Sequence, residues 1–218
     1  RGEGVNKLDP GTPFGGLHQE TDTRPGLSHD RVWSILENED RSLLVGTQSG
    51  LDWVDRDNET VVHYRHDPRR DQGLGPGDVR ALHRDQRGRL WVANQVGGLQ
   101  WLAASEKMGP ISSNPRLRSS AIESLGEGVI LDLAEAPSGE IFVASTAGVY
   151  GIDPESLEVT VELRDDSALH DRLSENRVNS LFFDNSGLLW LATEHRGLDR
   201  YDPTTGAIRR YRNDPIDQ

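Results

Sequence analysis

The sequence predicts an all-β protein built from four similar units, because three landmarks recur at one period. The first is a Gly-Leu or Gly-Val pair at positions 50–51, 98–99, 148–149 and 197–198, spaced by 48, 50 and 49 residues. The second is an apolar run before each pair, at residues 43–47, 90–94, 141–145 and 189–193. The third is a valine further upstream: Val32, Val79, Val129 and Val178. A period of this length, filled with short apolar runs and turns, indicates four-stranded β-propeller blades rather than helical hairpins.

The fourth copy shows most clearly why each unit is expected to hold four strands. Residues 178–183 form a short apolar run, and the turn 184–187 (Asp-Asn-Ser-Gly) follows, with Asp initiating and Gly able to take a positive φ. Residues 188–192 are apolar throughout, which predicts a strand buried on both faces. Residues 197–202 give a third strand, and residues 207–211 give a fourth, whose arginines suit a wet outer edge.

Equivalent features are expected in the other three copies. Their first hairpin turns are predicted at Asn38 to Arg41, Asp85 to Gly88 and Ala136 to Gly139. A small residue near the end of each second strand suits a close approach of neighbouring sheets. These residues are Gly46, Ala93, Ala144 and Ala192. Glycines and β-branched residues interrupt every stretch that could form a helix, which excludes a helical-repeat array.

The chain is expected to divide into a leader and four blades. Residues 1–26 are either a loose leader or carry a lone strand, around Phe14 to His18, that closes a ring. The blades are predicted at residues 27–68, 74–107, 121–163 and 173–214. Residues 106–120 are polar and are interpreted as a degraded outer strand plus a loop.

Four units are few for a closed ring, since natural propellers typically have four to eight blades. The chain is therefore expected to be a partial propeller of about four blades, taken from a longer one. An exposed apolar blade face would then need to be covered. A homodimer that packs through such a face is an open alternative.

The composition narrows the class of partner. The 218 residues carry a net charge of −12, which argues against nucleic acid and anionic membranes as main partners. No run of about 18 apolar residues occurs, so no direct membrane insertion is expected in this segment. The absence of cysteine excludes disulfides and thiol chemistry and fits either cytoplasm or periplasm.

The repeat also carries a recognisable pattern. It opens with Leu-Ser or similar and then a valine, continues with Asp-x-x-Gly and Leu-Trp-apolar-Ala/Gly-Thr, and ends with Gly-Leu and an aromatic-Asp turn. This pattern resembles the two-component-regulator propeller repeat. It is fullest in residues 173–202 and 27–55 and less complete in residues 74–102. The third copy departs most, with Phe142 for Trp, Ser145 for Thr and Gly151 for an aromatic residue.

The resemblance implies a sensory function. Such repeats usually form the periplasmic part of membrane-bound histidine kinases, hybrid sensors or diguanylate cyclases. The family implies recognition of an external, often carbohydrate-related ligand, and a location outside the cytoplasm as part of an inner-membrane protein. Fold resemblance alone cannot name that ligand.

Two sequence motifs imitate metal sites. His63 and His66 stand three apart on a predicted strand, so their imidazoles are expected to diverge. Asp55, Asp57 and Glu59 echo the start of a calcium loop, but the glycine and glutamate that such a loop needs further on are missing. An ordinary Asp-rich turn is the better interpretation. No cofactor, metal or catalytic residue is expected.

The tryptophans mostly suit packing. Trp91 and Trp190 share one repeat position, and Trp53 and Trp101 share another, which favours contacts between blades. Trp33 has no aromatic counterpart in the other copies. It could stack on a ring-shaped ligand, although a place in the core is somewhat better supported.

Propeller topology predicts a polar rim. The loop that enters each first strand and the loop that leaves each second strand lie on the same side, near the axis. Arginines on these loops could attract an anionic or polyhydroxyl ligand, although surface ion pairs explain any single residue as well. The candidate ligand-binding residues are Arg31, Trp33, Arg80, Asn94, Arg177, His195 and Arg196.

Three functions remain open from the sequence. The first is a non-catalytic, ligand-sensing module of a two-component-type receptor. The second is a propeller enzyme, such as a lyase that acts on a glycoside or lactone with His195 or His29 as the base. The third is a scaffold that binds protein through its blade faces and edges.

Overall fold

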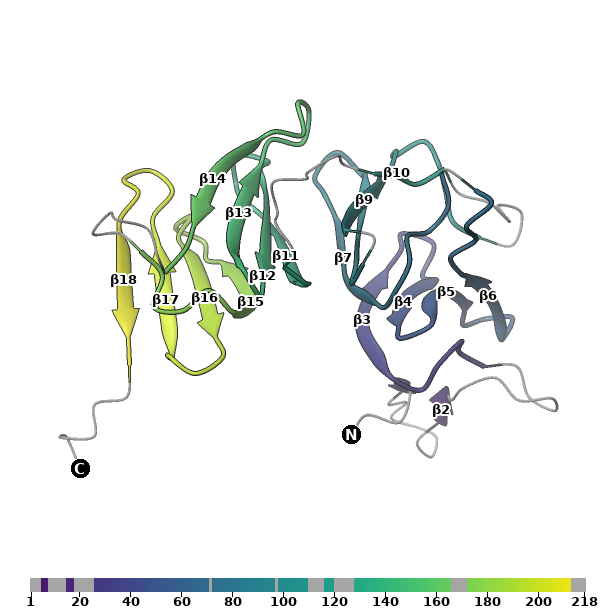
Figure 1. Cartoon of the computed structure of the whole chain (residues 1–218). Coiled ribbons are helices and arrows are strands. Elements are labelled where there is room, and N and C mark those ends of the chain that lie inside the picture. The colour runs from purple at the N-terminus through teal and green to yellow at the C-terminus, as the bar shows by residue number, and fades with distance from the viewer. Residues whose placement is uncertain are drawn as a thin grey trace. The chain divides into compact units, whose positions relative to one another are not determined.

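The computed structural model describes residues 5–7, 15–17, 26–70, 72–96, 98–109, 116–119, 128–165 and 172–212. Over these residues the chain is all-β, with strands β1 to β18 and no helix (Figure 1). Sixteen strands form four antiparallel four-stranded sheets, and in every sheet the strands lie in chain order. The predicted fold class and blade architecture are therefore confirmed. Among the described residues, no helix is long and apolar enough to cross a membrane.

The strands of each blade lie within the residues expected for it, except that β10 of blade 2 lies in residues 106–120, the segment interpreted above as a degraded outer strand plus a loop. Blade 1 holds β3 (Val32–Glu37), β4 (Leu43–Thr47), β5 (Gly50–Asp55) and β6 (Thr60–Tyr64). Blade 2 holds β7 (Val79–Arg84), β8 (Leu90–Asn94), β9 (Gly98–Leu102) and β10 (Arg118–Ser119). Blade 3 holds β11 (Ile130–Glu135), β12 (Ile141–Ser145), β13 (Gly148–Ile152) and β14 (Val159–Leu163). Blade 4 holds β15 (Val178–Phe183), β16 (Leu189–Thr193), β17 (Leu198–Tyr201) and β18 (Ile208–Tyr211).

The first hairpin turn of every blade lies where the sequence predicts it. In each turn the last residue donates a backbone hydrogen bond to the first: Arg41 to Asn38 (2.9 Å), Gly88 to Asp85 (2.8 Å), Gly139 to Ala136 (2.8 Å) and Gly187 to Asp184 (2.9 Å). That last residue has a positive φ in all four turns. Glycine takes this conformation freely, which explains its presence in three of them.

The strand register corrects one landmark. Val32, Val79 and Val178 pair with Thr47, Asn94 and Thr193, the last residues of their second strands. In blade 3 the residue that pairs in this way, with Ser145, is Ile130 and not Val129. Val129 and Ile130 are both apolar, so the sequence alone could not separate them.

The N-terminal segment contains two short strands. β1 (Val5–Lys7) and β2 (Gly15–Leu17) form an antiparallel two-stranded sheet. The predicted strand around residues 14–18 is thus present in part, and its partner in this sheet is β1, which the sequence reading did not anticipate. Phe14 and His18 themselves lie outside the described residues.

The chain forms two compact units, residues 1–119 and 120–218, and each is described by itself. In the first unit, blades 1 and 2 share one apolar core. Leu44, Trp53 and Tyr64 of blade 1 cluster with blade 2 residues that include Val79 and Leu90. A side chain on Gly46 would lie 2.6 Å from the carbonyl oxygen of Val79, so this close approach excludes anything larger.

The second unit repeats this arrangement with blades 3 and 4. Phe142 of blade 3 clusters with Leu189, Leu191 and Tyr201 of blade 4. The Phe142 ring meets the Phe183 ring edge-on at 5.3 Å. The carboxylate of Asp132 links the two blades further by accepting hydrogen bonds from β15 at 2.8 Å.

In blades 2 and 4 a hydrogen bond joins the aspartate of the Asp-x-x-Gly motif to the tryptophan of the Leu-Trp motif. Asp85 accepts hydrogen bonds from the backbone of its own turn and from Trp91 Nε1 at 2.9 Å. Asp184 does the same, with Trp190 Nε1 at 2.8 Å. One carboxylate therefore closes the turn and positions the tryptophan of the second strand.

Candidate functional site

Each blade has a rim, defined here as two parts: the loop before its first strand with the first two residues of that strand, and the turn after its second strand. One backbone hydrogen bond joins the two parts in every blade: Gln48 N to Arg31 O (3.1 Å), Gln95 N to Asp78 O (2.8 Å), Thr146 N to Val129 O (3.0 Å) and Glu194 N to Arg177 O (3.2 Å). Within each blade, the two loops therefore lie together as the topology predicts. These hydrogen bonds involve backbone atoms only, so the side chains of the two loops can differ from blade to blade.

A β-bulge at the start of each first strand adds a second common element. The register shifts between the first and third residues of all four strands. A bulge re-aims the side chain of the extra residue. The residues at this position are Trp33, Arg80, Leu131 and Asn179.

Trp33 and Arg80, the bulge residues of blades 1 and 2, meet on the rim of the first unit. The guanidinium carbon of Arg80 lies 3.8 Å from the centroid of the Trp33 ring, and that of Arg31 lies 5.9 Å away. Asp78 holds Arg80 in place through a 3.2 Å ion pair. Trp33 keeps 38% of its surface exposed. An aromatic face beside two cations suits a polar ring or an anion.

Asn94, also expected on this rim, is fully buried. Its side-chain amide donates to Gln100 Oε1 at 2.9 Å inside blade 2. The same position in blades 1 and 3 is held by the buried Thr47 and Ser145. Asn94 therefore belongs to the interior of the blade, and we leave it out of the proposed ligand contacts.

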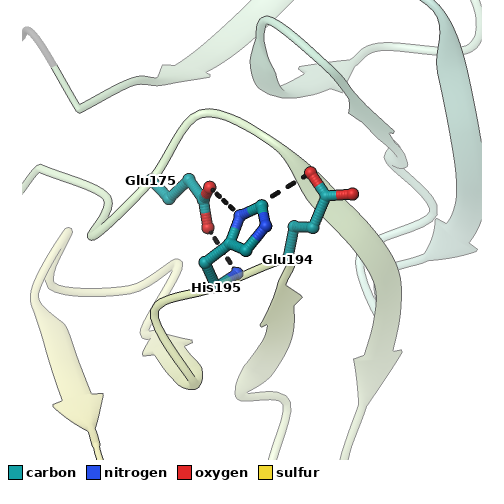
Figure 2. Close-up of side chains that lie close together, drawn as sticks. All are labelled: Glu175, Glu194 and His195. Carbon is teal, nitrogen blue, oxygen red and sulfur yellow. Dashed lines mark hydrogen bonds and ion pairs between the residues drawn. The ribbon is translucent and has the colours of Figure 1, made fainter.

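The rim of blade 4 gathers a compact group of titratable side chains (Figure 2). His195 Nδ1 lies 2.9 Å from Glu175 Oε1 and 3.8 Å from Glu194 Oε2. The backbone N–H of His195 also donates to Glu175 Oε2 at 2.8 Å. Glu175 thus binds the turn that carries His195 through both of its carboxylate oxygens.

Two arginines accompany this group. Arg177 Nε lies 2.7 Å from Glu194 Oε2. Arg196 is exposed, and its backbone N–H donates to Thr193 Oγ1 at 3.1 Å. The predicted residues Arg177, His195 and Arg196 therefore lie on one rim, in the second unit. Arg31, Trp33 and Arg80 lie on another, in the first unit.

The contacts between His195 and Glu175 change the protonation of both groups. The hydrogen bond that His195 Nδ1 donates to Glu175 raises the pKa of His195 above its ordinary value, with help from the charges of Glu175 and Glu194. The same hydrogen bond lowers the pKa of Glu175. Each group thus favours the charged form of the other.

Sequence reasoning missed Glu175. It stands 20 positions before His195 in a polar loop, and acidic residues are too common in this chain for a pair to be noticed. The signal that could have found it is the repeat itself. Glu175 lies in the loop that enters a first strand, and the topology places that loop beside the turn that holds His195.

The two motifs that imitate metal sites have structural roles. His63 Nδ1 lies 2.8 Å from Asp52 Oδ1, whereas His66 Nδ1 lies 2.8 Å from the carbonyl oxygen of Leu74. The two imidazoles therefore have different partners. Asp55 accepts hydrogen bonds from the backbone of Asp57 and from both the backbone and side chain of Asn58. It forms the Asp-rich turn expected above.

Successive four-stranded antiparallel blades define the class of the protein as a β-propeller repeat protein. Residues 73–95 and 172–195 match the family model described as the two component regulator propeller. Two segments of the chain, one in each of its two units, are therefore similar to two-component-regulator propeller repeats. The resemblance expected from the sequence is confirmed. None of the curated proteins compared with the chain is significantly similar to it.

Solved structures support the same fold. The extracellular domain of BT4673 from B. thetaiotaomicron is described as a one-component system in one structure and as a hybrid two-component system in another. Both structures match with a TM-score of 0.71 and 19% identity. The first match covers 100% of this chain and 26% of the BT4673 chain, and the second covers 98% and 25%. The extracellular domain of BT3049 from the same organism, described as a hybrid two-component system, matches with a TM-score of 0.68 and 16% identity. That match covers 92% of this chain and 24% of the BT3049 chain.

A propeller enzyme is also similar in fold. Virginiamycin B lyase from Staphylococcus aureus matches with a TM-score of 0.59 and 12% identity, over 85% of this chain and 56% of the lyase. The chain spans only about a quarter of the two extracellular domains. At these identities the likeness concerns the fold alone.

Proposed function

We propose that this chain is part of the extracytoplasmic sensory region of a membrane-bound, two-component-type receptor, and that its rims bind a small polar ligand without transforming it. The observation that carries the proposal is the repeat family. Its model matches two separate blades, and the similar solved structures are extracellular domains described as signalling systems. The ligand we propose is carbohydrate-related or anionic.

The rim of the first unit supports this ligand class. Trp33 offers a partly exposed aromatic face, and Arg31 and Arg80 bring guanidinium groups within 6 Å of its centre. Aromatic faces stack on ring-shaped ligands, and guanidinium groups bind carboxylates and phosphates with two parallel hydrogen bonds. A uronic acid combines both features, with a ring for Trp33 and a carboxylate for an arginine.

The enzymatic alternative rests on a different observation. His195 is paired with Glu175 at 2.9 Å on an exposed rim, and a histidine oriented by a carboxylate can act as a general acid or base. Virginiamycin B lyase, which is similar in fold, is an example of an enzyme on such a fold. Turnover of a glycoside or lactone that disappears in His195→Ala would favour this second function.

A ligand screen by thermal shift tests the receptor proposal. We expect the 218-residue chain to be stabilised by one class within a panel of neutral sugars, uronic acids and their oligomers, because a ligand that binds the folded state raises Tm. The shift should disappear when Trp33→Ala and Arg80→Ala are combined with Arg196→Ala.

The matched control is Arg41→Ala, which removes an exposed arginine in the first hairpin turn of blade 1, at the end of the blade opposite its rim. It should retain the full shift. An equal shift in the rim variant and the control would mean that the ligand binds elsewhere. Consumption of the ligand during the experiment would contradict a purely sensory function.

A further inference from the structure

The group Glu175, Glu194 and His195 has the make-up of a metal site. Its three ligand atoms, one carboxylate oxygen from each glutamate and Nδ1 of the histidine, all lie within 4.8 Å of one another. Metal–ligand bonds of about 2.0–2.2 Å place neighbouring ligand atoms roughly 3 to 4 Å apart. A small movement of side chains would therefore bring all three to one ion (Figure 2).

The backbone of this site is fixed before any ion arrives. The N–H of Glu194 donates to the carbonyl of Arg177 at 3.2 Å, and the N–H of His195 donates to Glu175 at 2.8 Å. The two loops that supply the ligands are thus joined at two points. A site that is already assembled loses less conformational entropy when it binds.

The fold does not need these residues. At the position of Glu194 the other three copies have Gln48, Gln95 and Thr146, and the same backbone hydrogen bond forms in each. At the position of His195 they have Ser49, Val96 and Ala147. Among the described residues, two acids and a histidine stand together only on the rim of the fourth copy, which points to a role other than folding.

A buried carboxylate is hydrogen-bonded to the loop that carries Glu175. Asp199 is fully buried, and its Oδ2 accepts a hydrogen bond at 2.7 Å from the backbone of Ser174, the residue before Glu175. Its Oδ1 has no hydrogen-bond partner among the described residues. In blade 1 the equivalent Asp52 is 2.8 Å from His63. The unpaired oxygen of Asp199 makes the base of this loop favourable for a cation.

We propose that Glu175, Glu194 and His195 bind a first-row divalent cation, with Zn²⁺ as the reference ion. Imidazole and carboxylate ligands suit Zn²⁺, Mn²⁺, Fe²⁺ and Ni²⁺, whereas Mg²⁺ and Ca²⁺ prefer oxygen ligands alone. The ion takes the place of the proton that His195 Nδ1 shares with Glu175, and that proton is released to solvent. Three protein ligands leave coordination positions open for water or for an oxygen of a ligand. The proposal does not depend on the receptor function.

Zinc titration of the whole 218-residue chain, by calorimetry after chelator treatment, tests the site. We expect one ion on this rim, and Glu175→Gln, Glu194→Gln and His195→Ser should each weaken its binding at least tenfold. Blades 1 and 2 have glutamine at the position of Glu194, so we expect Glu194→Gln to fold. If another variant fails to fold, Glu194→Gln decides the outcome. His29→Ser, in the equivalent loop of blade 1, is the matched control and should not change the affinity.

Arg177→Ala separates a metal site from a structural ion-pair network. Arg177 lies 2.7 Å from Glu194 and competes with a metal for that carboxylate. Its removal should therefore tighten zinc binding several-fold, whereas a network with only a structural role would gain nothing. The proposal is overturned if wild type and Glu194→Gln bind zinc within twofold of each other, if zinc does not bind, or if Mg²⁺ binds as tightly as zinc.

Discussion

The two ends of the blades follow different rules. At the hairpin end, blades 2 and 4 use the same parts, because an aspartate closes the turn and accepts a hydrogen bond from the tryptophan of the second strand. At the rim end, the blades share a backbone hydrogen bond and a bulge, whereas the side chains differ. The side chains that repeat between blades are those that the fold requires. The side chains that differ between blades are the ones that can serve a function.

The largest effect is expected from the repeated end. Trp91 is fully buried and is held by Asp85, so Trp91→Ala should destabilise the protein by about 3–5 kcal/mol through the cavity that it leaves. Trp190→Ala should cost less, because Trp190 is only partly buried. Chemical denaturation monitored by circular dichroism gives both values. Equal losses for the two variants would contradict the role of burial.

A second change tests the contact between blades 1 and 2. Gly46→Ala should cost about 1–3 kcal/mol, because the added carbon would lie 2.6 Å from the carbonyl of Val79. Gly73→Ala is the matched control, since the nearest atom to its added carbon lies 3.4 Å away. Equal midpoints in urea for the two variants would show that the sheets can separate at no cost.

A third change concerns the carboxylate of the repeated end. Burial opposes the charged form of Asp85, but hydrogen bonds from Trp91 and Arg89 outweigh it and lower the pKa of Asp85. Its contribution to stability is therefore complete above the unfolded value of about 3.9 and is lost as pH falls through the lower folded pKa. Asp85→Asn should cost about 1–2 kcal/mol at pH 7.

That cost should shrink below about pH 4, where wild type loses the same contribution. Urea denaturation between pH 7 and pH 3 measures the difference between the two proteins. A difference that stays constant over this range would assign the effect to packing rather than to charge.

The smallest effect on stability is expected at the rim. Arg31→Ala removes one exposed guanidinium that lies 5.9 Å from the centre of the Trp33 ring, and should change the free energy of unfolding by no more than about 0.5 kcal/mol. The fluorescence of Trp33 should change, because its neighbouring charge is removed. A loss comparable to that of Trp91→Ala would make this rim a structural element.

Local chemistry explains what the sequence predicted well. The turn from Asp184 to Gly187 was predictable because aspartate starts such turns and glycine accepts the positive φ at their end. The strands around it followed from apolar runs of the right length. The pairing of strands in chain order followed from the repeat.

The features that the sequence did not predict depend on strand register and on burial, and neither can be read from a single residue. The bulge at Trp33 and Arg80 has no sequence signal, so their stacking could not be foreseen. Asn94 looked like a surface residue because it is polar and ends a strand, yet it points into its blade. Glu175 became visible only when its loop was seen beside His195.

The bulge at the start of every first strand has a practical consequence. The extra residue stands outside the regular ladder, so its replacement leaves the pairing of the sheet untouched. Tryptophan, arginine, leucine and asparagine already occupy this place in the four copies. A designer could exchange these residues, changing Trp33 and Arg80 together because they stack, and graft new recognition onto an unchanged framework.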